Sequence, residues 1–256
     1  MMECVAIEVT EGVAVITMTR PPANAIDLQM GLELQGAVRE AGERDDVGAI
    51  VITGGRTLFA AGADIKAMAE FSPAEIEPVV GALGDALDLL EVLPKISIAA
   101  VNGFALGGGF ELALATDLRY LASDATVGQP EVNIGVIPGA GGTQRITQLA
   151  GAGVARELVY SGRMVPAEEA LRLRLAEKIL DPDAVLAAAI EDAARFAAGA
   201  RGALAAAKAA IRAAVETPGT KGLVRERALF TELFGGWEQR EGMRAFLEKR
   251  RPNFKS

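Results

Sequence analysis

The stretch Ile96-Ser-Ile-Ala-Ala-Val-Asn-Gly-Phe-Ala-Leu-Gly-Gly-Gly-Phe-Glu-Leu112 carries the signals on which our prediction of the fold depends. Its first six residues, Ile96 to Val101, form an apolar run that predicts a buried strand. Residues 103–109 hold four glycines and predict a flexible connection, and Phe110 to Thr116 then predicts the start of a helix. A triple glycine at a strand-to-helix junction leaves backbone N–H groups free to face a ligand.

On the N-terminal side of this stretch, strand and helix signals alternate. Ala6 to Thr19 alternates in hydrophobicity and turns at Glu11-Gly12, which predicts a β-hairpin. A helix is predicted from Asp27 to Glu43, and a short buried strand from Ala49 to Thr53. Ser72-Pro-Ala-Glu75 supplies a capping serine, a first-turn proline and a reciprocal glutamate, so an amphipathic helix should begin there.

On the C-terminal side, two further short strands are predicted over Leu118 to Ala122 and Thr126 to Val127. Short strands that alternate with helices indicate an α/β fold. Pro130 and Pro138-Gly-Ala-Gly-Gly142 predict an irregular, glycine-lined segment after them.

The composition changes at Ala184, and the alanine-rich segments beyond it carry no strand signal. Because alanine is the best helix former, residues 205–214 favour a packed helix over the alternative of a disordered linker. We therefore divide the chain into a core of residues 1–183 and a helical region of residues 184–256.

Composition excludes several kinds of chemistry. The chain of 256 residues is 50% hydrophobic, enough for a substantial core. It has no histidine, which excludes Ser-His-Asp and Cys-His arrangements and histidine zinc sites. Cys4 is the single cysteine, so a disulfide within the chain and a cysteine-rich zinc site are both excluded. We expect no metal site.

The charge and the apolar runs limit the partners. A formal net charge of −8 disfavours binding of nucleic acid or anionic membranes by the bulk surface. No apolar run reaches the roughly eighteen residues that a bilayer span needs, and the N-terminus lacks the basic start of a signal peptide. We expect a cytoplasmic protein with no nucleic-acid partner and no membrane partner.

Two glutamates, twenty residues apart, each follow a glycine-bearing segment: Glu111 in Leu106-Gly-Gly-Gly-Phe-Glu-Leu112 and Glu131 in Gly128-Gln-Pro-Glu131. Paired carboxylates can move protons, and glycine-exposed amides can hold an anion, so together they indicate acid/base catalysis. Taken singly, each has another explanation. The glycines could serve a tight turn, Glu111 could lie exposed on a first helical turn, and Glu131 could form a structural salt bridge.

Four stretches make the combination specific. They are Ala60-Ala-Gly-Ala-Asp-Ile-Lys66, Ile98 to Leu112, Gly128 to Glu131, and Gly135-Val-Ile-Pro-Gly-Ala-Gly-Gly-Thr-Gln-Arg145. In content, order and spacing these stretches resemble the enoyl-CoA hydratase/isomerase (crotonase) superfamily, and the resemblance extends over the whole chain. Among its members, the chain is most similar to the enoyl-CoA hydratases.

The resemblance implies an α/β fold in which ββα units wind into a spiral, followed by a helical C-terminal region used for trimer formation. Such trimers often stack as a dimer of trimers, so the expected partner is a homotrimer or homohexamer. The implied ligand is an acyl thioester of coenzyme A, which is part of the substrate, so no separate cofactor is expected.

The resemblance also implies roles for individual residues. The backbone N–H groups of Ala63 and Gly108 would hold the thioester oxygen as an oxyanion hole. Glu111 and Glu131 would both hold the attacking water, with Glu111 as the base and Glu131 as the donor of a proton to the α carbon. The backbone of Gly139 would help to place that water.

The path of coenzyme A is implied less directly. Residue by residue, Ala61, Asp64, Ile65 and Lys66 would line it, although an ordinary solvated loop is the alternative. A basic C-terminal tail, Lys249 to Lys255, is either a solvated helix end or a source of contacts to a neighbour's coenzyme phosphates.

The predicted function is hydration of a trans-2-enoyl-CoA to a 3-hydroxyacyl-CoA by a lyase of the hydro-lyase type. Hydratases of the superfamily carry both glutamates, whereas many isomerases and other relatives keep only one. Two alternatives remain: a double-bond isomerase or another acyl-CoA reaction that uses mainly Glu131, and a non-catalytic acyl-CoA-binding or scaffold subunit.

Overall fold

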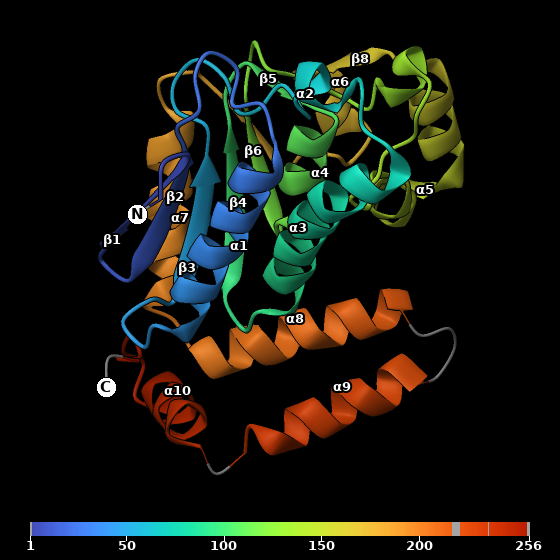
Figure 1. Cartoon of the computed structure of the whole chain (residues 1–256). Coiled ribbons are helices and arrows are strands. Elements are labelled where there is room, and N and C mark those ends of the chain that lie inside the picture. The colour runs from blue at the N-terminus through green and yellow to red at the C-terminus, as the bar shows by residue number, and fades with distance from the viewer. Residues whose placement is uncertain (1, 217–220, 235, 255–256) are drawn as a thin grey trace.

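The structure is a computed structural model that describes residues 2–216, 221–234 and 236–254 (Figure 1). The strands are β1 (Val5–Thr10), β2 (Val13–Met18), β3 (Ala49–Thr53), β4 (Ile96–Val101), β5 (Phe104–Leu106), β6 (Leu118–Ala122), β7 (Thr126–Gly128), β8 (Met164–Pro166) and β9 (Lys178–Leu180). The helices are α1 (Leu28–Glu43), α2 (Ile65–Met68), α3 (Pro73–Val92), α4 (Gly108–Ala115), the 3₁₀ helix η1 (Glu131–Ile134), α5 (Gly142–Ser161), α6 (Ala167–Arg172), α7 (Val185–Ala197), α8 (Arg201–Glu216), α9 (Lys221–Glu232) and α10 (Trp237–Leu247).

The larger sheet has six strands in the order β1-β2-β3-β4-β6-β9. β1 and β2 form the predicted antiparallel hairpin, and the other neighbours are parallel, with Val15 beside Val51 and Val51 beside Ile98. All five residues of β3 are buried, because helices cover both faces of this part of the sheet. The continuous apolar runs of β3 and β4 follow from that burial.

The smaller sheet has three strands in the order β5-β7-β8, with β5 parallel to β7 and β7 antiparallel to β8. The chain passes from β4 to β5 and again from β6 to β7, so each turn contributes one strand to each sheet. This alternation is the spiral of ββα units that the resemblance implies. The prediction that residues 103–109 are only a flexible connection was wrong, because Phe104–Leu106 pairs with Thr126–Gly128 as a strand.

Helices lie on both faces of the larger sheet (Figure 1), with α7 on one side and α1 and α3 on the other. α1 begins as predicted at Asp27, whose Oδ1 accepts a hydrogen bond from Met30 N at 2.9 Å. α3 begins at the predicted capping box, where Glu75 Oε2 accepts from Ser72 N at 2.8 Å. These caps fix the residues at which the two helices begin.

The C-terminal part of the described chain is helical from Val185, as predicted, and the alanine-rich residues 205–214 lie within α8. α7 packs on the larger sheet, whereas α8, α9 and α10 lie together below it in Figure 1. Lys208 ties α8 to the core, since its Nζ donates to Leu90 O, Lys95 O and Asp117 Oδ2. The division of the chain at residue 184 stays a prediction.

None of the helices in the described part of the chain combines the length and the hydrophobicity that a bilayer crossing requires.

Candidate active site

The triple glycine brings two loops into contact. Gly107 has a φ of +50°, and a Cβ on it would lie 3.2 Å from Glu131 Oε1. A Cβ on Gly109 would lie 2.4 Å from Ala60 O, so backbone meets backbone there. Ala60 N also donates to Phe104 O, and Leu106 N donates to Ala60 O, each at 3.0 Å. The glycines therefore serve close packing, and that packing places the loop of Ala63 beside the start of α4.

A cavity of about 500 Å³ opens at this contact. Five predicted site residues line it together: Ala63, Gly108, Glu111, Glu131 and Gly139. The rest of the wall is formed by Gly135 and by apolar side chains; these are Ile26, Met68, Ile76, Val79, Val80, Leu83, Ile134, Val136, Ile137 and Ala140. Two carboxyl groups in an otherwise apolar cavity suit acid/base chemistry on a substrate with an apolar chain.

Two backbone amides of the cavity are free to bind an anion. Gly108 is the first residue of α4, so its N–H has no acceptor within its own helix. Among the described residues, no hydrogen bond uses the N–H of Ala63 as its donor. Both residues line the cavity, which is the arrangement that an oxyanion hole requires.

Glu111 lies in the first turn of α4 and is only 3% exposed, so the alternative of an exposed glutamate was wrong. Its Oε1 accepts hydrogen bonds from Ala140 N at 2.8 Å and from Gly142 N at 2.7 Å. Gly142 is the first residue of α5, so this carboxyl group caps the N-terminus of that helix. The other carboxyl oxygen of Glu111, Oε2, faces Gly108: a Cβ added to that glycine would lie 4.0 Å from it.

The environment of Glu111 acts on its pKa in opposite directions. Burial raises the pKa, whereas the amides of Gly142 and Ala140 and the positive charge of Arg145 lower it, and the net direction is upward. The three lowering contributions all favour the ionised carboxylate. Glu111 is therefore a buried carboxyl group whose ionised form is stabilised by two hydrogen bonds and a nearby positive charge.

Glu131 is the first residue of η1 and is half-buried. Burial raises the pKa of its carboxyl group to about 7, against a lowering by its own backbone amide, and the nearby negative charge of Glu111 adds to the increase. No lysine or arginine of the described residues contributes to this shift, so the alternative of a structural salt bridge was wrong. The negative charge of Glu111 therefore acts on the protonation of Glu131.

Gln129 contacts Glu131 directly, which sequence reasoning did not predict. Its side chain is 1% exposed. With its amide nitrogen turned toward Glu131, that nitrogen donates to Oε1 at 2.7 Å and to Oε2 at 3.1 Å. With its amide oxygen turned there instead, it can accept the proton of a neutral Glu131. The position of Gln129, two residues before the glutamate, was the only available signal.

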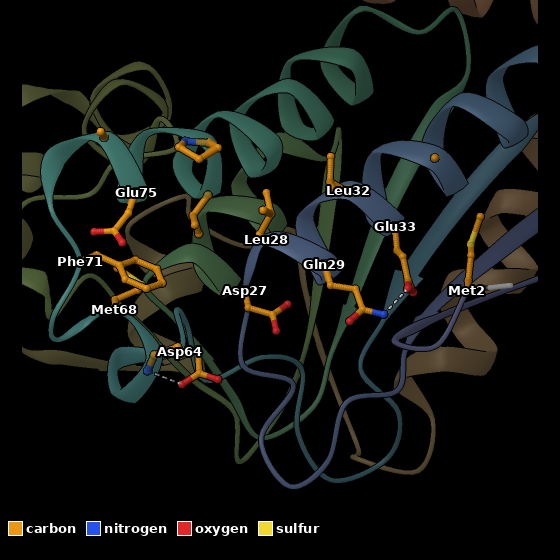
Figure 2. Close-up of a pocket in the computed structure, with 15 residues that line it drawn as sticks. Met2, Asp27, Leu28, Gln29, Leu32, Glu33, Asp64, Met68, Phe71 and Glu75 are labelled. Carbon is orange, nitrogen blue, oxygen red and sulfur yellow. Dashed lines mark hydrogen bonds between the residues drawn. The ribbon is translucent and has the colours of Figure 1, made fainter.

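A second, larger groove of about 1040 Å³ lies beside the cavity, between α1, α2 and α3 (Figure 2). The two hollows share Met68 and Val79 in their walls. Among the described residues, four carboxyl groups line the groove, those of Asp27, Glu33, Asp64 and Glu75, and Arg20 pairs with Asp27 and Asp64.

The four residues predicted along the path of coenzyme A lie outside the wall of the 500 Å³ cavity. Asp64 lines the larger groove, caps α2 through Ala67 N and pairs with Arg20 at 2.8 Å. Ala61 is exposed on the loop before Asp64, and Ile65 and Lys66 are exposed on α2. Their contacts with the coenzyme stay a prediction.

The basic C-terminal tail is partly engaged within the chain. Arg250 forms ion pairs with Glu241 and Glu248, each at 2.6 Å, and Lys249 has a φ of +55° at the end of α10. Arg250 therefore stabilises the helix end, as one of the two explanations requires. Lys255 lies outside the described residues.

Comparison with known proteins shows the family of this chain. The sequence profile of the enoyl-CoA hydratase/isomerase family matches residues 8–256. The chain belongs to this family. The crotonyl-CoA hydratase of Syntrophomonas wolfei is 41% identical over 255 residues, which are 98% of each chain. The short-chain-enoyl-CoA hydratase of Clostridium acetobutylicum is 40% identical over 242 residues, 93% of this chain and 92% of that protein.

The fold agrees as well. The crystal structure of an enoyl-CoA hydratase from Bacillus anthracis has a TM-score of 0.94 with this chain, at 35% identity and with 99% of both chains covered. The predicted superfamily, with enoyl-CoA hydratases as its most similar members, and the predicted α/β fold are confirmed. In this family member, the roles of the individual site residues remain predictions.

Proposed function

We propose that this protein is an enoyl-CoA hydratase, which adds water to a trans-2-enoyl-CoA to give a 3-hydroxyacyl-CoA. One observation carries the proposal: two carboxyl groups and two free backbone amides line a single apolar cavity. Coenzyme A enters as part of the substrate, and we propose no separate cofactor.

The enzyme class follows from the relatives. The two named relatives are hydratases of enoyl thioesters and align with more than nine-tenths of the chain, so this protein is a hydro-lyase. The apolar wall of the cavity, formed by residues such as Val80, Leu83 and Ile137, offers room for the acyl chain.

The amides of Ala63 and Gly108 would bind the thioester oxygen. Attack on the conjugated double bond moves negative charge onto this oxygen, and a preorganised N–H donor stabilises it more in the transition state than in the ground state. Each such donor typically contributes about 2.7–4 kcal/mol to catalysis. Backbone donors also need no particular protonation state.

The surroundings of the two glutamates divide the acid and base roles between them. Burial raises the pKa of Glu111 overall, but two amides and the charge of Arg145 oppose that rise and stabilise the ionised form, as a base requires. Glu131 has a pKa of about 7, so a substantial fraction stays protonated at neutral pH, which suits a proton donor.

In the proposed reaction, Glu111 takes a proton from the bound water while the water oxygen forms a bond to the β carbon. The electron pair of the double bond moves onto the thioester, and Glu131 gives its proton to the α carbon. The backbone of Gly139, which also lines the cavity, would help to place the water. Transfer of the gained proton from Glu111 to Glu131, through solvent, restores both groups.

The test is loss of the conjugated thioester when purified protein is added to crotonyl-CoA, repeated with Glu111→Gln and Glu131→Gln. We expect the wild-type protein to form 3-hydroxybutyryl-CoA and each variant to lose on the order of 10²–10⁴-fold in kcat. Full activity in either variant would contradict the mechanism. An isomerase would lose activity only with Glu131→Gln, and a scaffold subunit would bind the thioester without turnover.

We also propose that helices α8 to α10 mediate assembly into a trimer, or a dimer of trimers, in the cytoplasm. Large apolar side chains on these helices are exposed, among them Phe230 at 63%, Phe246 at 82% and Leu247 at 80%. Exposed apolar patches of this kind mark interaction surfaces. The single cysteine, Cys4, fits a reducing compartment.

A further inference from the structure

Ala140 makes two backbone contacts in opposite directions. Its N–H donates to Glu111 Oε1 at 2.8 Å, and its carbonyl oxygen accepts from Nη1 of Arg145 at 2.5 Å. Ala140 therefore joins the carboxyl group in the cavity to a guanidinium group behind the cavity wall. A shift of this residue would move both contacts together.

Arg145 is fixed by charge and by burial. It lies in the second turn of α5, and its side chain is 6% exposed. Both carboxyl oxygens of Glu91, on α3, accept hydrogen bonds from Arg145: Nε donates to Oε1 at 2.8 Å, and Nη2 donates to Oε2 at 3.2 Å. Such a paired contact fixes the plane of the guanidinium as well as its position. The outer contact, Asp88, is mostly solvent-exposed.

The loop between Ala140 and α5 is shaped around this guanidinium. Gly141 has a φ of +106°, and a Cβ on it would lie 2.1 Å from Arg145 Nη1. No side chain fits at this position while the arginine is in place. The next residue, Gly142, donates the second hydrogen bond to Glu111 Oε1 at 2.7 Å.

We propose that the Arg145–Glu91 pair has a positioning role in hydration. It holds residues 140–142 in place, so that the N–H groups of Ala140 and Gly142 fix the Glu111 carboxylate in the cavity. This inference rests on the proposed function. Arg145 touches neither the cavity nor the reacting atoms, and it acts through Ala140. Through these contacts the pair connects α3, α4 and α5 and fixes their positions relative to one another at the site.

Three variants separate the geometry of Arg145 from its charge. Arg145→Lys keeps the positive charge but loses the planar fork, Arg145→Gln loses both, and Glu91→Gln keeps the size of the partner but removes its charge. Arg163→Lys is the matched control, because Arg163 also pairs with two carboxylates, Glu157 and Glu169, away from the cavity wall. Melting temperatures and the Kd for butyryl-CoA are measured for each variant.

We expect Arg145→Lys and Glu91→Gln to lower kcat for crotonyl-CoA about 10- to 100-fold, because small misplacements of a catalytic group have effects of this size. The Kd for butyryl-CoA should stay within about twofold of wild type, since the acyl wall and the amides of Ala63 and Gly108 are unchanged. Arg145→Gln should also shift the acidic limb of the pH profile of kcat/KM to higher pH, because loss of the positive charge raises the pKa of Glu111. The control should match wild type.

Wild-type kcat in Arg145→Lys and Glu91→Gln, with an unmoved pH profile in Arg145→Gln, would overturn the positioning role and leave the proposed function intact. Parallel losses of butyryl-CoA binding and of melting temperature would also overturn it, since they would indicate a purely structural role. A wild-type protein that hydrates no enoyl thioester would instead overturn the proposed function.

Discussion

Burial makes ionisation of the Glu131 carboxyl group unfavourable. Its pKa of about 7 in the folded protein lies above the ordinary value of 4.5, so the folded state binds more protons than the unfolded state between these values. The stability that the neutral group contributes is present below about pH 4.5 and is lost as the pH rises through 7. The protein therefore gives up stability at neutral pH to keep a proton donor in the cavity.

This cost predicts the effect of Glu131→Gln on stability. The variant cannot ionise, so its melting temperature should exceed that of wild type by about 2–4 °C at pH 8, the shift expected for ~1 kcal/mol in a chain of this size. At pH 5, where the folded-state glutamate is mostly neutral and only part of this stability is lost, the difference should be much smaller. Thermal denaturation at both pH values is the measurement, and an equal offset at pH 5 and pH 8 would contradict the assignment.

Gly109 is a second residue whose identity follows from geometry. A methyl group there would press on Ala60 O, so Gly109→Ala should lower stability by about 1–3 kcal/mol and reduce kcat by displacing the loop of Ala63. Gly153→Ala is the control, because Gly153 lies exposed within α5 with open space beside it and should gain up to ~1 kcal/mol. Urea denaturation and crotonyl-CoA turnover check both; an unchanged Gly109→Ala variant would refute the close contact.

At this scale, the sequence allowed the cavity residues to be predicted, but not the contacts that orient them. Glu111, Glu131, Ala63, Gly108 and Gly139 lie in short motifs, and the structure brings all five to one cavity. The bonds from Ala140 and Gly142 to Glu111 cross about thirty residues of chain. No periodicity or motif in one sequence encodes contacts between such distant segments.

At the scale of single elements, predictability depended on length and periodicity. The hairpin, α1, β3, α3, β4 and β6 are long enough to show a pattern, and the structure confirms them. β5, β8 and β9 have three residues each and were missed, whereas β7, of the same length, was predicted from Thr126-Val127. The helix α5 was missed because its glycines weaken the helical signal, and Gly151, with a φ of +85°, interrupts the helix itself.

The end of α6 contains an unusual residue for its backbone. Arg174 has a φ of +62° and follows the helix, with Arg174 N donating to Leu171 O and Leu175 N donating to Ala170 O. This pair of bonds is a Schellman motif, in which the left-handed position usually holds glycine. Arginine is strained in this left-handed backbone conformation because of its Cβ, and glycine would not be.

Arg174→Gly should therefore stabilise the protein by about 0.5–1 kcal/mol, the relief of the left-handed backbone less the added freedom of the unfolded chain. Arg172→Gly, on the same helix but with ordinary helical backbone, should instead cost about 1 kcal/mol. Urea midpoints of the two variants provide the measurement. A loss of stability in Arg174→Gly would mean that the arginine side chain contributes more than its backbone costs.

At the scale of the whole molecule, the apolar surface of the C-terminal helices predicts self-association. Phe246→Glu puts a charge on a side chain that is 82% exposed in the single chain, so it should leave the fold intact and shift the protein from three or six chain masses toward one. Phe246→Leu keeps an apolar surface and is the control. Light scattering after gel filtration measures the mass, and an assembly indifferent to Phe246→Glu would place the interface elsewhere.

The fold brings together three loops, after β3, after β5 and after β7, and the central claim is that they bind one thioester between two amides and two carboxyl groups. A crystal structure of the protein with butyryl-CoA tests this claim most directly. We expect the thioester oxygen to lie about 2.7–3.1 Å from both Ala63 N and Gly108 N, with the carboxyl groups of Glu111 and Glu131 on the same side of the α and β carbons. A thioester oxygen out of reach of either amide, or carboxyl groups that face away from the acyl chain, would contradict the account.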